Sequence, residues 1–142
     1  MSLISDLRTY FDDRIKALDA TYVFIDDPFG DDSISENYGD SNYKLWFGGI
    51  SREKGPNYYS DIIEATIEIY SEECRDNTGA FDSVYNKAIE MADYIIDPVC
   101  IETVSSITDI QLNSIEPSPV GDNDNMVKVV LLFTIRKDFK FC

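Results

Sequence analysis

The sequence predicts an α+β fold, in which a mostly antiparallel, twisted sheet is covered by two main helices. The first observation is residues 61–70, where apolar and polar side chains alternate with a period of two, as in a strand with one buried and one solvated face. The second is residues 81–96, where apolar side chains recur at mostly helical spacing until Pro98 ends the helix. The third is residues 126–136, the most apolar strand candidate. A sheet face and a helix stripe of this kind bury one another.

The N-terminal residues 2–18 have the pattern of an amphipathic helix. Their apolar side chains form an imperfect stripe, and Asp12, Asp13 and Lys16 fall outside it. We expect this helix to pack on the sheet. The apolar run 22–25 that follows is expected to form a short strand.

An acidic stretch follows, with six acids and no base between Asp26 and Asp40. We tested it as a calcium loop by placing Gly30 at the sixth position of an EF-hand, which puts Glu36 correctly at the twelfth. The first and fifth positions are then Ile25 and Phe29, whose side chains cannot bind a cation. The segment is therefore interpreted as a solvated acidic loop, with an irregular cation site as the lesser alternative.

Aromatic and basic residues gather in the next segment. Residues 43–47 are expected to form a strand that ends at Gly48-Gly49, and residues 51–57 a loop. A basic loop beside aromatic side chains could bind an acidic neighbour, and the plainer alternative is that the aromatic side chains cover the edge of the core. The candidate partner-binding residues are Trp46, Arg52, Lys54, Tyr58 and Tyr59.

The C-terminal part is predicted to be a long antiparallel hairpin. After Pro98, residues 99–104 form a connector that could be extended. Residues 105–116 alternate imperfectly, which suggests a bulge or a twisted edge. Two prolines and a glycine predict a loop at 117–125. Residues 126–136 are apolar on one face and interrupted by Val and Leu on the other, so we expect a central strand covered on both sides.

Length and terminal sequence set the class of protein. A chain of 142 residues is expected to form a single domain, residues 1–142, with a substantial core. We expect no membrane segment, because no apolar run approaches the roughly 20 residues needed to span a bilayer, and the N-terminus lacks the pattern of a signal peptide. The three scattered cysteines are interpreted as reduced thiols, as in a protein that stays inside the cell or in a particle assembled there.

The net charge of −15 disfavours ordinary binding to nucleic acid or to an anionic membrane surface. Three uses of this acidity remain open. It can simply keep the protein soluble, it can form a wall past which DNA slides without adhering, or it can imitate DNA to occupy a DNA-binding partner.

The sequence offers no catalytic constellation. It contains no histidine, which removes the commonest general base and a common metal ligand, and it has no nucleophile elbow, P-loop or dinucleotide-binding glycine motif. In a chain with 27 acids some pair of carboxylates is always available, so the presence of such a pair does not indicate a catalytic site. We therefore predict no enzyme activity, no catalytic residue, no cofactor and no metal site.

The order of these elements resembles the tail terminator proteins of long-tailed bacteriophages, the family that includes the minor tail protein U of phage lambda. The resemblance is carried by the helix at 3–18, the early strand at 22–25, the strand–helix pair at 62–96 and the hairpin at 107–136. It covers nearly the whole chain and rests on the length of the chain, the order of its elements and the general pattern of apolar and polar residues.

The resemblance implies a subunit of a homo-hexameric ring in the virion, at the head–tail junction, made in the cytoplasm of a host bacterium. Such a ring caps the head-proximal end of the tail tube, stops its polymerisation and joins it to the neck. Its implied partners are further copies of itself, the major tail tube protein and a neck or head-completion protein. DNA would pass through the bore without specific binding. Our own candidates for acids that face this lumen are Asp26, Asp27, Asp31 and Asp32, because they lie in the acidic stretch 26–40.

Three rival functions remain open at this point. A neck or tail-completion protein shares the size, acidity and ring symmetry. An acidic DNA-mimic inhibitor would need carboxylates spaced like phosphates on one surface, whereas here the acids are spread along the chain. A small acid-catalysis enzyme would need a carboxylate pair in a closed pocket.

Overall fold

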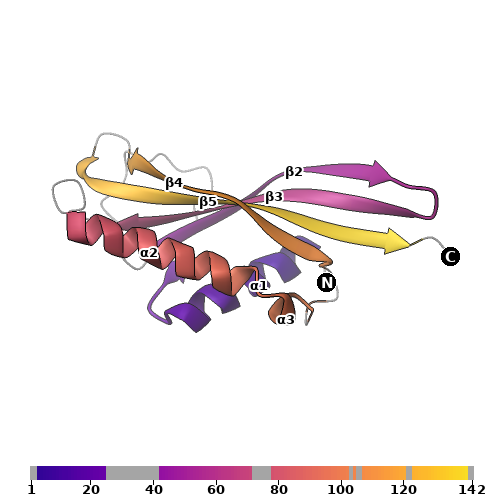
Figure 1. The fold of residues 1–142 in the computed structure, drawn as a ribbon, viewed down its shortest axis with the longest axis horizontal. Coiled ribbons are helices and arrows are strands. Elements are labelled where there is room, and N and C mark those ends of the chain that lie inside the picture. Colours follow the sequence, from indigo (N-terminus) through magenta and orange to yellow (C-terminus); the bar gives the residue numbers. More distant parts are fainter. Residues whose placement is uncertain are drawn as a thin grey trace.

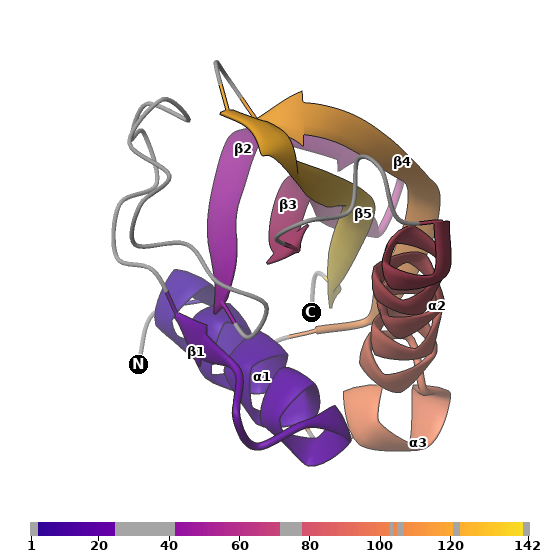
Figure 2. The ribbon, with the colours of Figure 1, turned by 90° about the vertical axis from the view of Figure 1, so that its left-hand side faces the viewer.

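Two helices pack against one face of a twisted sheet in the computed structural model, which describes residues 3–24, 42–71, 78–102, 104, 107–120 and 123–140 (Figures 1 and 2). In chain order the elements are α1 (Leu3–Leu18), β1 (Val23–Phe24), β2 (Asn42–Lys54), β3 (Tyr58–Ser71), α2 (Thr78–Ile95), α3 (Pro98–Ile101), β4 (Asp109–Val120) and β5 (Asn123–Lys140). The α+β fold class is confirmed.

The described strands form one sheet in the order β1-β2-β3-β5-β4. β1 runs parallel to β2, and the other neighbouring strands are antiparallel. β3 and β5 lie in the interior of the sheet, and the central position expected for β5 is confirmed. β4 and β5 form the predicted hairpin, and the predicted bulge lies between Leu112 and Ser114.

The core lies between the helices and the sheet face beneath them. Ile67 of β3 is fully buried there, and the ring of Phe11 from α1 meets the ring of Phe133 from β5 edge-on at 5.7 Å between centroids. The buried Tyr10 hydroxyl donates a hydrogen bond of 2.5 Å to the carbonyl of Ile95, so α1 is joined to the end of α2. Apolar burial and this bond fix the two helices side by side.

Several strands are longer than the sequence predicts. β2 continues through Gly48-Gly49 to Lys54, so the loop expected at 51–57 is wrong except for its last residues. β4 continues through two prolines to Val120, and β5 begins at Asn123, so the expected loop at 117–125 is also mostly strand. Prolines fit β4 because it is an edge strand, where a backbone N–H is not needed on the outer side.

On the sheet face away from the helices, the burial of side chains differs from what the alternation of polar and apolar residues predicts. Glu68 and Tyr70 were expected on a solvated face, yet both are buried, and the Tyr70 hydroxyl donates to Glu68 at 2.6 Å. Lys128 of β5 pairs with the same carboxylate at 3.2 Å. Farther along, Leu132 is 36% exposed, so the expectation that β5 is covered on both sides is wrong at that position.

The connector after α2 is also different from the expectation. Pro98 follows the end of α2 and starts the short helix α3, whereas residues 99–104 were expected to form a connector that could be extended. Asp97 caps α3, since its carboxylate accepts a hydrogen bond of 3.0 Å from the backbone N–H of Val99. Proline suits the first turn of a helix, where its missing N–H costs nothing.

Within the described ranges, no helix combines the length and apolar character needed to cross a bilayer. The expectation of a single domain stays a prediction.

Candidate partner-binding surface on the sheet arm

Part of the sheet extends beyond the two helices (Figure 1). We call it the arm, and define it as residues 50–63 of β2 and β3 together with residues 135–139 of β5. Backbone pairing is continuous along it, from Ile50 opposite Ile63 to Lys54 opposite Tyr59. Its tip is a tight turn, in which the N–H of Gly55 donates to the carbonyl of Tyr58 at 2.8 Å.

A bulge in β2 decides which side chains share a face of the arm. Phe47 pairs with Ala65 and Ile50 pairs with Ile63, so Gly48 and Gly49 together lie opposite the single residue Glu64. The extra residue shifts the alternation of β2 by one. Before the bulge, the odd-numbered residues of β2 point to the side of the sheet that carries the helices. After the bulge, the even-numbered residues point to that side.

The helix-side face of the arm carries a basic and aromatic cluster. We call it the arm patch, and its members are Arg52, Lys54, Tyr59, Lys137 and Phe139. The rings of Tyr59 and Phe139 stack with centroids 4.6 Å apart and an interplanar angle of 16°. The Arg52 guanidinium lies 4.3 Å from the centroid of Tyr59, and the Lys137 ammonium lies 5.4 Å from that of Phe139. Cations over ring faces are held by the ring quadrupoles, so the patch is an ordered, positively charged surface.

Asp61 fixes the position of Arg52 within the arm patch. The guanidinium donates two hydrogen bonds to the carboxylate, 2.6 Å from Nε to Oδ1 and 3.1 Å from Nη2 to Oδ2. The hydrogen bond from Arg52 holds the pKa of Asp61 below its usual value, so the carboxylate stays ionised in mild acid. The side chain of Arg52 remains 59% exposed and can still meet a partner.

The opposite face of the arm carries a polar network. Ser60 is fully buried, and its hydroxyl donates to Asp138 at 2.5 Å and accepts from Arg136 at 3.2 Å. The Arg136 guanidinium also donates to Asp138 at 2.9 Å. These bonds, the Ser60 hydroxyl first, hold the pKa of Asp138 below its usual value. The network joins β3 to β5 and stiffens the arm.

The structure divides the five predicted partner-binding residues between two faces. Arg52, Lys54 and Tyr59 lie together in the arm patch, and their role in binding a partner stays a prediction. Tyr58 is 40% exposed and lies on the opposite face beside Gly55, where any Cβ would clash with its ring. Trp46 is half-buried, lies before the bulge opposite Thr66, and faces away from the helices. The bulge separates Trp46 from Arg52 and Lys54, and the alternation along β3 separates Tyr58 from Tyr59, so the five residues form no single surface.

Two members of the arm patch were missed from the sequence. Lys137 and Phe139 lie in the last part of β5, which extends to Lys140 although the predicted strand ended at Arg136. The signal was present, because Ile135, Lys137 and Phe139 continue the period of two. The four acids expected to face a lumen, Asp26, Asp27, Asp31 and Asp32, lie outside the described residues.

A pocket of about 300 Å³ lies between α1 and β2. Asp12 lines it, accepts a hydrogen bond from the Tyr43 hydroxyl and pairs with Lys16 at 3.1 Å. Burial raises the pKa of Tyr43, so its phenol stays protonated as a donor. The described lining holds this single carboxylate and so offers no acid–base pair; its residues are Arg8, Thr9, Asp12, Lys16, Phe24, Tyr43 and Leu45.

Potential metal ligands are also scattered. Within the part of the chain that the structure describes, no three His, Cys, Asp or Glu side chains are grouped so that they could hold a metal ion.

No protein-family model and no curated protein matches this sequence. Among solved structures, the fold is similar to that of a chain in the virion of a native gene transfer agent particle, with a TM-score of 0.54 and 12% sequence identity. The similarity covers 97% of this chain and 92% of that chain. At this level of identity it shows a shared fold.

Proposed function

We propose that this protein is a structural component of a phage-like virion. The observation that carries the proposal is the similarity to a chain of a gene transfer agent virion, which spans nearly all of both chains. The aligned region covers 97% of this chain, so the proposal rests on the fold as a whole and not on one segment. A protein with this role binds other proteins and needs no catalytic residue.

Within that role, we propose a tail terminator that forms a hexameric ring, ends the tail tube and joins it to the neck. The element order supports this assignment, because it resembles that family along nearly the whole chain. The arm patch supports it further, since a ring subunit must contact a neighbour through a defined surface. The proposed partners are other copies of the protein, the tail tube protein and a neck or head-completion protein.

The acidity of the chain fits passage of DNA through such a ring. A net charge of −15 per subunit gives a ring a strongly negative field, which keeps phosphates from adhering to its wall. A DNA mimic is less well supported, because acids in the described elements occur on helices and on both faces of the sheet.

The proposal is tested by locating the protein on purified virions with a gold-labelled antibody. We expect label at the head–tail junction, in the neck region of the particle. Depletion of the protein before assembly should then produce tails of excess length, as expected when polymerisation is not ended. Tails of normal length without attached heads would indicate a neck or completion protein. Absence of label from the virion would contradict the structural role itself.

A further inference from the structure

We propose that the arm patch of one copy docks on the acidic outer face of α2 in a second copy. The inference deepens the proposed function, since it rests on that assembly and names the surfaces that join its subunits. It commits to a second copy of this chain as the occupant of the arm patch. The contact is between different surfaces on the two copies.

The arm patch contains a cation, Lys54, that no carboxylate in the described part of the chain neutralises. Elsewhere most lysines and arginines pair locally, as Lys87 does with Asp19 at 3.7 Å and Lys128 with Glu68 at 3.2 Å. In the arm patch, Asp61 faces Arg52, but the exposed ammonium group of Lys54 pairs with no carboxylate among the described residues. A local excess of positive charge in a chain of net charge −15 points to an acidic partner.

The arm patch also offers apolar surface beside these cations. The stacked rings of Tyr59 and Phe139 are only half-buried, and Ile50, on the same face, is 57% exposed. Stacked aromatic rings present a flat, rigid area that loses little conformational freedom on binding. Such surfaces with a charged rim are typical of protein–protein contacts.

The outer face of α2 has the complementary chemistry. Asp82, Ile89 and Asp93 follow one another at helical spacing on the side away from the core, with Glu90 beside them. Ile89 is 42% exposed, and the three carboxylates make no ion pair with any described residue. Glu90 and Asp93 stand three residues apart, where like charges on a helix repel. A cation brought by another copy would relieve that repulsion.

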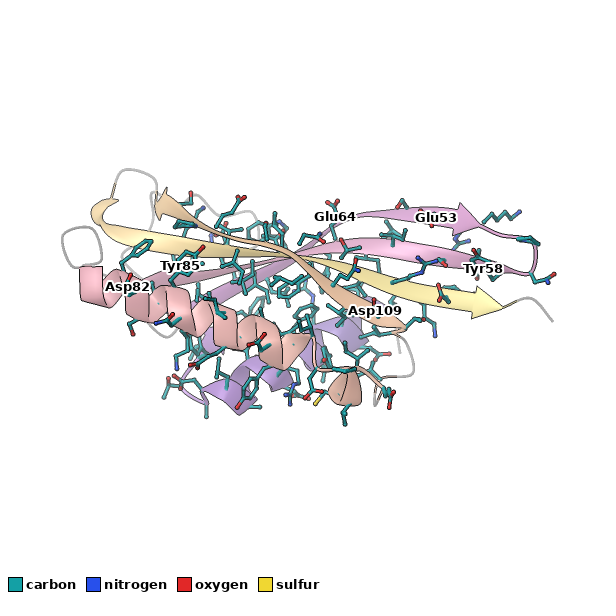
Figure 3. The ribbon with its side chains drawn as sticks, viewed as in Figure 1. Glu53, Tyr58, Glu64, Asp82, Tyr85 and Asp109 are labelled. Atoms are coloured by element: carbon teal, nitrogen blue, oxygen red, sulfur yellow. The ribbon has the colours of Figure 1, made fainter. Side chains whose placement is uncertain are left out.

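The geometry requires that the two surfaces belong to different copies. Figure 3 shows Asp82 on α2 and Tyr58 at the tip of the arm near opposite ends of the molecule. The arm is held in the sheet by continuous pairing with β5, so it cannot fold back on its own helix. A head-to-tail contact of this kind closes into a ring when the rotation between copies is suitable. It also lets strongly acidic chains associate, because each junction places cations against acids.

The test uses Lys54→Glu and Glu90→Lys, two exposed positions whose reversal should leave the fold intact. Each variant alone should associate at least about tenfold more weakly than the wild type in sedimentation velocity, because each creates a like-charge contact. The two variants mixed in equal amounts should associate again, because every junction between the two variants pairs opposite charges. At one junction the carboxylate introduced at position 54 faces the ammonium group introduced at position 90, and at the next the unchanged Lys54 faces the unchanged Glu90. Glu53→Lys, on the opposite face of the arm, is the matched control and should associate at least as well as the wild type.

A second measurement keeps the test decisive for weak association. A zero-length carbodiimide crosslinker is added to a mixture of isotopically light and heavy wild-type protein at about 1 mM, where contacts of millimolar affinity are populated. We expect mixed-isotope peptides that join Lys54 to Asp82, Glu90 or Asp93. Failure of the variants to rescue each other, or absence of these crosslinks, overturns the docking site. Virion labelling and tail length test the proposed function separately, so a ring joined by other surfaces would remain distinguishable.

Discussion

The buried ion pair between Glu68 and Lys128 gives a sharp test of the sheet face that lacks a helix. The carboxylate is 3.2 Å from the ammonium group and also accepts a hydrogen bond of 2.6 Å from Tyr70. The side chains of Glu68 and Lys128 are only 8% and 12% exposed. At an effective dielectric constant of about 20, unit charges at this distance attract by about 5 kcal/mol before desolvation is counted.

Replacing Lys128 by Met keeps the length of the side chain but leaves the carboxylate without this cation. Removing one member of a buried pair costs about 3–5 kcal/mol. Tyr70 still donates to Glu68, and Lys44 is the cross-strand neighbour of Glu68 on the same face, so we expect the lower end, about 3 kcal/mol. The free energy of unfolding is measured by urea titration followed by circular dichroism.

Two controls separate the ion pair from general damage. The double variant Glu68→Gln with Lys128→Met should recover most of the loss, because an apolar and neutral pair no longer carries an unpaired charge. Lys16→Met breaks the pair with Asp12, whose side chains are 50% and 32% exposed, and should cost under about 0.5 kcal/mol. A loss below about 1 kcal/mol for Lys128→Met is typical of an exposed ion pair and would refute the conclusion that Glu68 and Lys128 form a buried one.

Three further predictions concern the core and the titratable groups. Ile67→Ala should lower the free energy of unfolding by about 3 kcal/mol and Ile67→Asp should prevent folding, since this side chain is fully buried; a native melting profile for the Asp variant would contradict the sheet assignment. The pKa of Asp61 is lowered in the folded protein, so its contribution is present above the unfolded pKa and is lost as the pH falls through the folded one. The difference in unfolding free energy between wild type and Asp61→Asn should therefore shrink on acidification, and a constant difference would contradict the pairing with Arg52. Burial raises the pKa of Tyr10 to about 12, so its contribution to the free energy of unfolding is full below the ordinary value near 10 and is lost as the pH rises toward 12. Tyr10→Phe should lower the free energy of unfolding by about 1 kcal/mol at pH 8 and reduce the loss of stability at alkaline pH. An unchanged dependence of stability on alkaline pH would contradict the hydrogen bond to Ile95.

The sequence determined the elements whose signal is local. Period-two alternation identified β3, helical spacing identified α2, and the irregular alternation near 112–114 indicated the bulge in β4. These patterns are readable because one face of each element is buried against a single apolar layer. The antiparallel β4–β5 hairpin followed because its two strands are neighbours in the chain. The α+β class required no more than these elements.

Sequence reasoning failed where a residue's environment depends on a distant strand. Glu68 and Tyr70 alternate like solvated residues, and only the approach of Lys128 from β5 shows how a charged group is accommodated in a buried position there. The prolines of β4 were read as a loop because local rules exclude them from strands. An edge position, which depends on the order of the strands in the sheet, removes that exclusion.

The candidate site shows the same division. The sequence by itself determined that basic and aromatic residues gather at 52–59 in a strongly acidic chain, which allowed two interpretations, binding to an acidic neighbour or cover for the edge of the core. Only the tertiary structure decided which of them share a surface. The two-against-one pairing at Gly48-Gly49 sends Trp46 to one face and Arg52 to the other, and β5 brings Phe139 against Tyr59. The physical reason is that a strand's side chains are assigned to a face by its register with its neighbours, and register is a property of the paired sheet.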